Sequence, residues 1–209
     1  MRSYLMEFIG TMFLVLAVTL SGNPIAIGVM LMVMVYMGGH VSGGHYNPAV
    51  TLAVWIRGKI EAKDALAYWL SQVLGAFVAA WLCYILIGKV NAPVPGANVE
   101  AWQAILVEIL FTFALASIVL TVATTEKLKG NYIYGLAIGF TLMTGVFSGG
   151  PISGGAYNPA VALGTELVDV FIGGSAINNI LIYLVGPLLG GALAAYIFRY
   201  LNYEEFGAK

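Results

Sequence analysis

Apolar residues gather in six long runs along the chain, separated by short polar or glycine-rich segments. A helix needs about 20 predominantly apolar residues to cross the hydrocarbon core of a bilayer. The pattern therefore predicts six transmembrane helices. The second and fifth runs are too short as drawn, and we expect their helices to continue into the neighbouring glycine-rich segments. The six runs are Tyr4–Leu20, Ile25–Met37, Ala65–Ile87, Ala101–Thr121, Tyr132–Phe147 and Ile177–Leu201.

Two further apolar segments, Ala49–Ile56 and Ala160–Phe171, are too short to cross a bilayer. An Asn-Pro pair stands directly before each of them, Asn47-Pro48 and Asn158-Pro159. Asn is a favoured helix N-cap and Pro is favoured at the first helical position. We therefore predict two re-entrant half-helices. Irregular backbone is tolerated at membrane depth only where protein covers it or water lines it, so we expect the half-helices to meet around a pore.

The chain also repeats itself. Ser42–Val50 returns almost unchanged as Ser153–Val161, 111 positions later, and the same Glu-to-Thr spacing follows Glu7 in the first run and Glu108 in the fourth. We expect one transmembrane domain over residues 1–209, built from two repeats of about 1–100 and 101–209. An odd number of crossings in each repeat inverts the second. The expected fold is an all-α membrane protein with six transmembrane helices and two half-helices in an inverted 3+3 repeat.

Composition agrees with a membrane location. Hydrophobic residues make up 60% of the chain and charged residues only 9%, against about 25% charged in soluble domains. A net charge of -1 argues against a nucleic-acid partner, which would require a basic patch. The first run contains Glu7 and lacks a small-residue cleavage site, so we interpret it as a retained helix rather than a signal peptide.

The cationic residues predict the orientation. If the N-terminus is cytoplasmic, the outer loops contain only Lys89, and all other cationic residues fall at the cytoplasmic ends. Such a bias is typical of multi-pass proteins of the cell membrane with both termini inside. The residues at the cytoplasmic ends are Arg2, Arg57, Lys59, Lys63, Lys127, Lys129, Arg199 and Lys209.

Glu7 and Glu108 are ionisable residues inside predicted spans, and such residues are functional candidates. They could form a proton relay, or each could accept hydrogen bonds from the irregular loop before a half-helix. We favour the supporting role because the two positions are related by the repeat and no third titratable group continues a relay. His45 is expected to hold its own loop. Two His and one Cys are too few for a metal site or a nucleophilic triad, so neither an enzyme nor a cofactor is expected.

The doubled Ser-Gly-Gly-x-Tyr-Asn-Pro-Ala-Val motif and the paired glutamates resemble the aquaporin and aquaglyceroporin (major intrinsic protein) family. This resemblance implies two half-helices that meet in the middle of the membrane, one pore in each subunit, and a homotetramer. It places six residues at the pore midplane: Asn47, Pro48, Ala49, Asn158, Pro159 and Ala160.

In most members of that family an Arg follows the second Asn-Pro-Ala and forms a narrow outer filter with three other residues. Here Val161 occupies that position, and the other filter positions fall on Ile27, Val146 and Gly155. The filter is therefore aliphatic, without the donors and fixed charge of a guanidinium. We expect a wider and more apolar outer constriction, which favours ammonia, glycerol or urea relative to water.

These observations predict a passive channel for water or small neutral solutes. Two helix N-termini directed at one midplane create a positive potential there, which disfavours cations. The side-chain amides of Asn47 and Asn158 offer donors to a passing solute. Two alternatives stay open: an ion- or proton-coupled secondary transporter, because inverted repeats and broken helices also build those proteins, and a non-conducting membrane scaffold.

Overall fold

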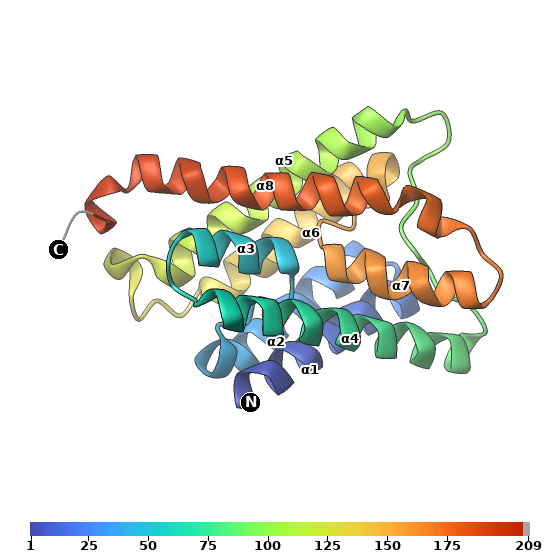
Figure 1. Ribbon diagram of the computed structural model, residues 1–209, viewed down its shortest axis with the longest axis horizontal. Coiled ribbons are helices and arrows are strands. Elements are labelled where there is room, and N and C mark those ends of the chain that lie inside the picture. The colour runs from blue at the N-terminus through green and yellow to red at the C-terminus, as the bar shows by residue number, and fades with distance from the viewer. Residues whose placement is uncertain (207–209) are drawn as a thin grey trace.

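The computed structural model describes residues 1–206, and every regular element within them is a helix (Figure 1). Lys209, which the sequence assigns to the cytoplasmic side, lies outside the described residues. The α-helices are α1 (Arg2–Ser21), α2 (Pro24–Ser42), α3 (Pro48–Ile56), α4 (Ala62–Ile87), α5 (Ala101–Thr124), α6 (Tyr134–Ser153), α7 (Pro159–Phe171) and α8 (Ile180–Leu201). Three short 3-10 helices are η1 (Glu126–Leu128), η2 (Ala176–Asn179) and η3 (Tyr203–Glu205).

Six of these helices are long and apolar enough to cross a membrane: α1, α2, α4, α5, α6, and α8 together with η2. The predicted all-α class with six spanning helices is therefore confirmed. The two short runs do continue into glycine-rich sequence, α2 as far as Ser42 and α6 as far as Ser153. Both end where a glycine takes the left-handed conformation, at Gly43 (φ 89°) and Gly154 (φ 91°).

The contacts between helices follow the sequence repeat. Helix α1 packs against α2 and α4, and α5 packs in the same way against α6 and α8. Helices α2 and α6 contact each other across the centre. Each short helix packs against the last long helix of the other repeat, α3 against α8 and α7 against α4. In Figure 1, α3 and α7 lie roughly in line, with their N-terminal ends toward the middle of the molecule.

The crossing of α2 and α6 depends on two glycines. A Cβ atom at Gly28 would lie 2.6 Å from the carbonyl oxygen of Gly139, and one at Gly139 would lie 2.4 Å from the carbonyl oxygen of Gly28. No side chain fits at either position, so the two backbones approach directly, as small residues permit in membrane helices.

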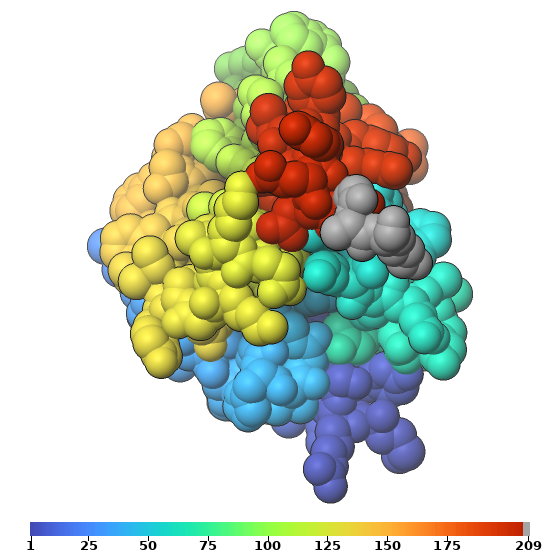
Figure 2. All heavy atoms as spheres, turned by 90° about the vertical axis from the view of Figure 1, so that its left-hand side faces the viewer, coloured from blue at the N-terminus to red at the C-terminus, as the bar shows by residue number. Residues whose placement is uncertain are grey.

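Both ends of the described chain lie at the same end of the molecule. Figure 2 views this end and shows the N-terminal residues, the α3–α4 connection, the α5–α6 connection and the end of α8 on one face. Arg57 lies here at the end of α3 and pairs with Glu205 of η3 at 3.0 Å. This ion pair therefore attaches the C-terminal turn η3 to the end of the half-helix α3.

The glycine crossing generates a stability prediction. Gly139→Ala should lower the free energy of unfolding by about 1–3 kcal/mol, because overpacking forces the backbones apart. Gly150→Ala is the matched control on the same helix, since a Cβ atom there would meet only the Val146 side chain at an ordinary 3.7 Å. Thermal unfolding in detergent measures both variants. Equal unfolding temperatures for the two would contradict the role assigned to this crossing.

Candidate functional site

The two half-helices begin with the same local geometry. The Asn47 side chain accepts a hydrogen bond from the N–H of Ala49 at 2.8 Å, and Asn158 accepts one from Ala160 at 3.0 Å. The residues just before them, Tyr46 and Tyr157, have positive φ angles of 50° and 48°. Such a conformation is uncommon for a bulky residue. The structure around each turn must therefore compensate for it.

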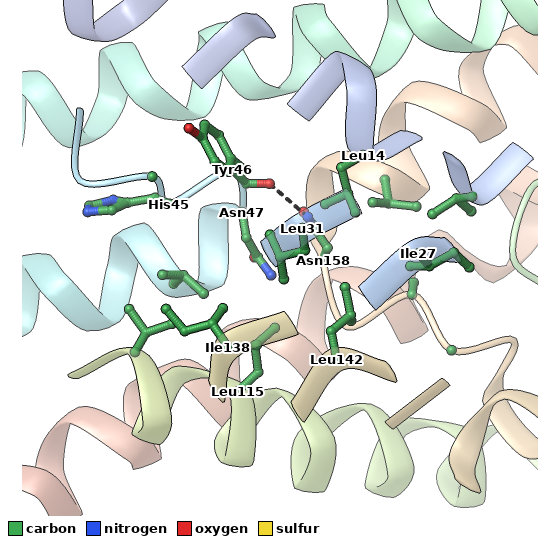
Figure 3. A pocket seen from close by; sticks show the side chains of 17 residues that line it. Leu14, Ile27, Leu31, His45, Tyr46, Asn47, Leu115, Ile138, Leu142 and Asn158 are labelled. Atoms are coloured by element: carbon green, nitrogen blue, oxygen red, sulfur yellow. Dashed lines mark hydrogen bonds between the residues drawn. The ribbon is translucent and has the colours of Figure 1, made fainter. Parts of the chain in front are cut away.

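The two asparagines also connect the half-helices to each other. Asn47 Nδ2 donates to the Tyr157 carbonyl at 2.8 Å. Asn158 Nδ2 donates to the Tyr46 carbonyl at 2.9 Å, the dashed line in Figure 3. An amide group has two N–H donors. One donor of each asparagine is used in this reciprocal pair, and the second remains for a molecule in the cavity between them.

Glu7 holds the turn before α3. Its carboxylate is fully buried and accepts four hydrogen bonds: from Ser42 Oγ at 2.6 Å, His45 N at 3.0 Å, Tyr46 N at 2.6 Å and Gln72 Nε2 at 2.8 Å. Two of these donors are backbone groups of the strained turn. The carboxylate thus satisfies N–H groups that the bilayer interior could not.

Glu108 makes matching contacts before α7. It is also fully buried and accepts from Ser153 Oγ at 2.8 Å, Ala156 N at 3.0 Å and Tyr157 N at 2.6 Å. The distances reproduce those of Glu7 to within 0.2 Å for each equivalent donor. Both glutamates therefore lie beside the half-helix turns and point away from the cavity, which neither of them lines.

A narrow cavity passes between the half-helix tips. Its volume is about 20 Å³, which is room for about one water molecule. Asn47 and Asn158 provide its side-chain amides, and most of the remaining wall is aliphatic (Figure 3). Aliphatic residues in the wall are Leu14, Val18, Ile27, Leu31, Val50, Leu115, Val119, Ile138, Leu142 and Val161.

Sequence reasoning missed most of this aliphatic wall, although the repeat contains a signal for it. Leu14 and Val18 return 101 positions later as Leu115 and Val119, the same offset that separates the two glutamates. Leu31 returns 111 positions later as Leu142, the offset of the two asparagines. Because these residues repeat with the same offsets as the glutamates and the asparagines, they could have been predicted to line the cavity.

The structure brings together three of the four residues assigned to the outer filter. Ile27, Gly155 and Val161 line the cavity. Val146 lies one turn beyond Leu142 on α6, is half-buried and packs against the main apolar core, outside the cavity wall. The four other residues expected at the midplane, Pro48, Ala49, Pro159 and Ala160, are buried in the first turns of α3 and α7.

A larger vestibule of about 970 Å³ lies next to the cavity, at the end of the molecule that holds both ends of the described chain. His45 lines both spaces, and its Nδ1 lies 3.1 Å from Thr51 Oγ1. His40, Lys59 and Lys129 also line the vestibule. Within residues 1–206, no group of three or more His, Cys, Asp or Glu side chains is placed to hold a metal ion.

Comparison with known proteins agrees with this geometry. Residues 1–198 match the family model described as Major intrinsic protein. Aquaporin NIP1-4 of Oryza sativa subsp. japonica is 35% identical over 220 residues, which cover 97% of this chain and 77% of that protein. Glycerol uptake facilitator protein-like 6 of Lactiplantibacillus plantarum is 34% identical over 224 residues, which cover 98% and 100%.

A solved structure shares the fold. The X-ray structure of the aquaglyceroporin from Plasmodium falciparum superposes with a TM-score of 0.85 and covers 99% of both chains. The two sequences are 20% identical, so the likeness concerns the arrangement of the helices and not the solute.

The carboxylate contacts generate a second prediction. Glu7→Gln replaces one acceptor oxygen by an NH2 group and leaves at least one buried donor without an acceptor. This should lower the free energy of unfolding by about 1–3 kcal/mol. Glu61→Gln is the control, because Glu61 forms an exposed pair with Lys63 and such pairs contribute about 1 kcal/mol or less. Thermal unfolding in detergent separates the two, and an equal effect would argue against the supporting role of Glu7.

Proposed function

Since the chain belongs to the major intrinsic protein family, we propose that it is a passive membrane channel for water and small neutral solutes. One observation carries the proposal: the tips of two half-helices meet in a narrow cavity, where Asn47 and Asn158 are the two side-chain amides. The printed names of the relatives, an aquaporin and a glycerol uptake facilitator, support the same class of solute.

Ions are excluded by the helices themselves. Each half-helix N-terminus carries about half a positive charge, and α3 and α7 direct two such termini at the same place. A cation entering the cavity loses its hydration shell against aliphatic walls and meets this positive potential. A neutral solute does not meet this charge barrier and can accept hydrogen bonds from the asparagine side chains.

We assign the outer filter to Ile27, Gly155 and Val161, which line the cavity, together with Val146 one turn beyond Leu142 on α6. We place this filter on the side of the asparagines away from the vestibule. None of these side chains can donate a hydrogen bond. A polar solute therefore loses hydrogen bonds there, at a cost that rises with its polarity. The filter should favour ammonia, glycerol or urea over water, relative to a filter that contains Arg.

We place the vestibule and both termini in the cytoplasm. The vestibule end carries Lys59 and Lys129 in its wall and Lys127 close by, in an ion pair with Glu204, as the positive-inside rule requires. The family resemblance favours a homotetramer with one pore in each subunit. We assign each subunit a single domain of two repeats, about 1–100 and 101–209.

Stopped-flow light scattering on proteoliposomes tests the channel. We expect vesicles with the protein to shrink and re-swell faster than empty vesicles in gradients of water, glycerol or ammonium. Each solute should move only down its own concentration gradient. Equal rates in empty and loaded vesicles for every solute would favour the non-conducting scaffold, and concentrative uptake that collapses with an uncoupler would favour the coupled transporter.

Val161→Arg tests the filter. The guanidinium adds donors and a fixed charge at the outer constriction, so the ratio of glycerol to water permeability should fall about tenfold, or about 1.4 kcal/mol in relative barrier height. Val161→Leu keeps an aliphatic side chain and should leave the ratio within about twofold. The ratio is measured in the same proteoliposomes, and its failure to change in Val161→Arg would remove Val161 from the filter.

A further inference from the structure

The proposed outer filter has an equivalent in the other half of the chain. Residues of α2, of the turn after it and of the first half-helix correspond to residues 111 positions later in α6, in its turn and in the second half-helix. With this offset, Ile27 corresponds to Ile138, Val146 to Val35, Gly155 to Gly44 and Val161 to Val50. Every residue type is the same in both sets. The sequence thus contains the same aliphatic quartet twice.

The backbone that positions the two quartets is also equivalent. Tyr46 Oη donates to the Met34 carbonyl at 2.9 Å, and Tyr157 Oη donates to the Gly145 carbonyl at 2.9 Å. These bonds attach α2 and α6 in the same way to the turns before the half-helices. The offset therefore relates positions in space as well as in the sequence.

Three residues of the second quartet line the same passage. Ile138, Gly44 and Val50 line the cavity, as do their equivalents in the first quartet. Ile27 and Ile138 are equally buried, with 4% of each exposed. In Figure 3 the two isoleucines lie on opposite sides of the asparagines. Ile138 also borders the vestibule, together with Val35.

We propose that Ile138, Val35, Gly44 and Val50 form a second constriction on the vestibule side, with the same aliphatic chemistry as the outer filter. This inference rests on the proposed channel function. A small neutral solute would cross two apolar rings in series and meet side-chain amide donors only between them. Among the paired cavity-lining residues, His45 and Ala156 are the pair whose types differ.

Two barriers in series give a distinctive flux pattern. Glycerol permeability of proteoliposomes, normalised to the amount of folded channel, is compared for Ile27→Ala, Ile138→Ala and the double variant. Two equal barriers predict a rise of at most about twofold for each single variant, because the other barrier remains, and at least about tenfold for the double variant. Water permeability is measured on the same vesicles.

Matched controls come from the lipid-facing sides of the same helices. Ile25 of α2 is 53% exposed and its equivalent in α6, Leu136, is 42% exposed. Ile25→Ala and Leu136→Ala should leave the permeability unchanged. If the alanine variants do not fold, Ile27→Val and Ile138→Val should show the same pattern with smaller rises, and its absence there would count against the inference.

A single outer constriction would give a different result. Ile27→Ala alone would then reproduce the whole rise of the double variant, and Ile138→Ala would have no effect, which would overturn the second constriction. If the wild-type chain conducts nothing, the proposed channel function fails. The second constriction would then be supported only if both single variants stay closed while the double variant conducts.

Discussion

The structure depends on satisfying the backbone of two turns inside the membrane. A peptide group without a hydrogen-bond partner costs several kcal/mol in hydrocarbon, and each half-helix begins after a turn that no regular element can satisfy. Glu7 and Glu108 provide the acceptors, two backbone N–H groups each. The asparagines then satisfy the turn carbonyls of the opposite half. Neither turn is complete alone, so the two half-helices stabilise each other.

This reciprocity explains why the passage is so nearly symmetric. Three equivalent donors hold each turn at distances that agree within 0.2 Å, and Gln72 adds a fourth bond to Glu7 alone. Equivalent residues therefore meet the cavity from equivalent positions. Differences between the two sides of the cavity wall then come from residue type, and the vestibule adds a difference beyond the wall on one side. In this chain the types differ between His45 and Ala156, and otherwise the aliphatic wall is the same on both sides of the asparagines.

Local chemistry made much of this fold predictable. The six spans follow from the length of apolar runs, and the starts of α3 and α7 follow from Asn-Pro, because capping and the fixed φ of proline act within a few residues. The exact ends of α2 and α6 were harder to predict, because the glycine-rich sequence stays helical until Gly43 and Gly154 adopt positive φ.

Contacts between segments far apart in the chain could not be predicted from the sequence. Val146 was assigned to the filter by counting, but where its side chain lies depends on the rotation of α6 against the core. The buried pair of Arg57 and Glu205 joins residues 148 positions apart. Glu166 is fully buried in α7, and its carboxylate has no hydrogen-bond partner among residues 1–206. No local pattern distinguishes such a residue from a solvated one.

The arrangement of polar groups also limits which solutes can pass quickly. A molecule that enters the cavity exchanges water for aliphatic side chains before it reaches the asparagines, so the highest points of its path lie where it has the fewest hydrogen bonds. The asparagine donors stabilise it only at the midplane, between these points. Stronger binding there deepens a well without lowering the barriers on either side. With the two proposed aliphatic constrictions, selectivity would therefore depend on these constrictions more than on the Asn-Pro-Ala motif that identifies the family.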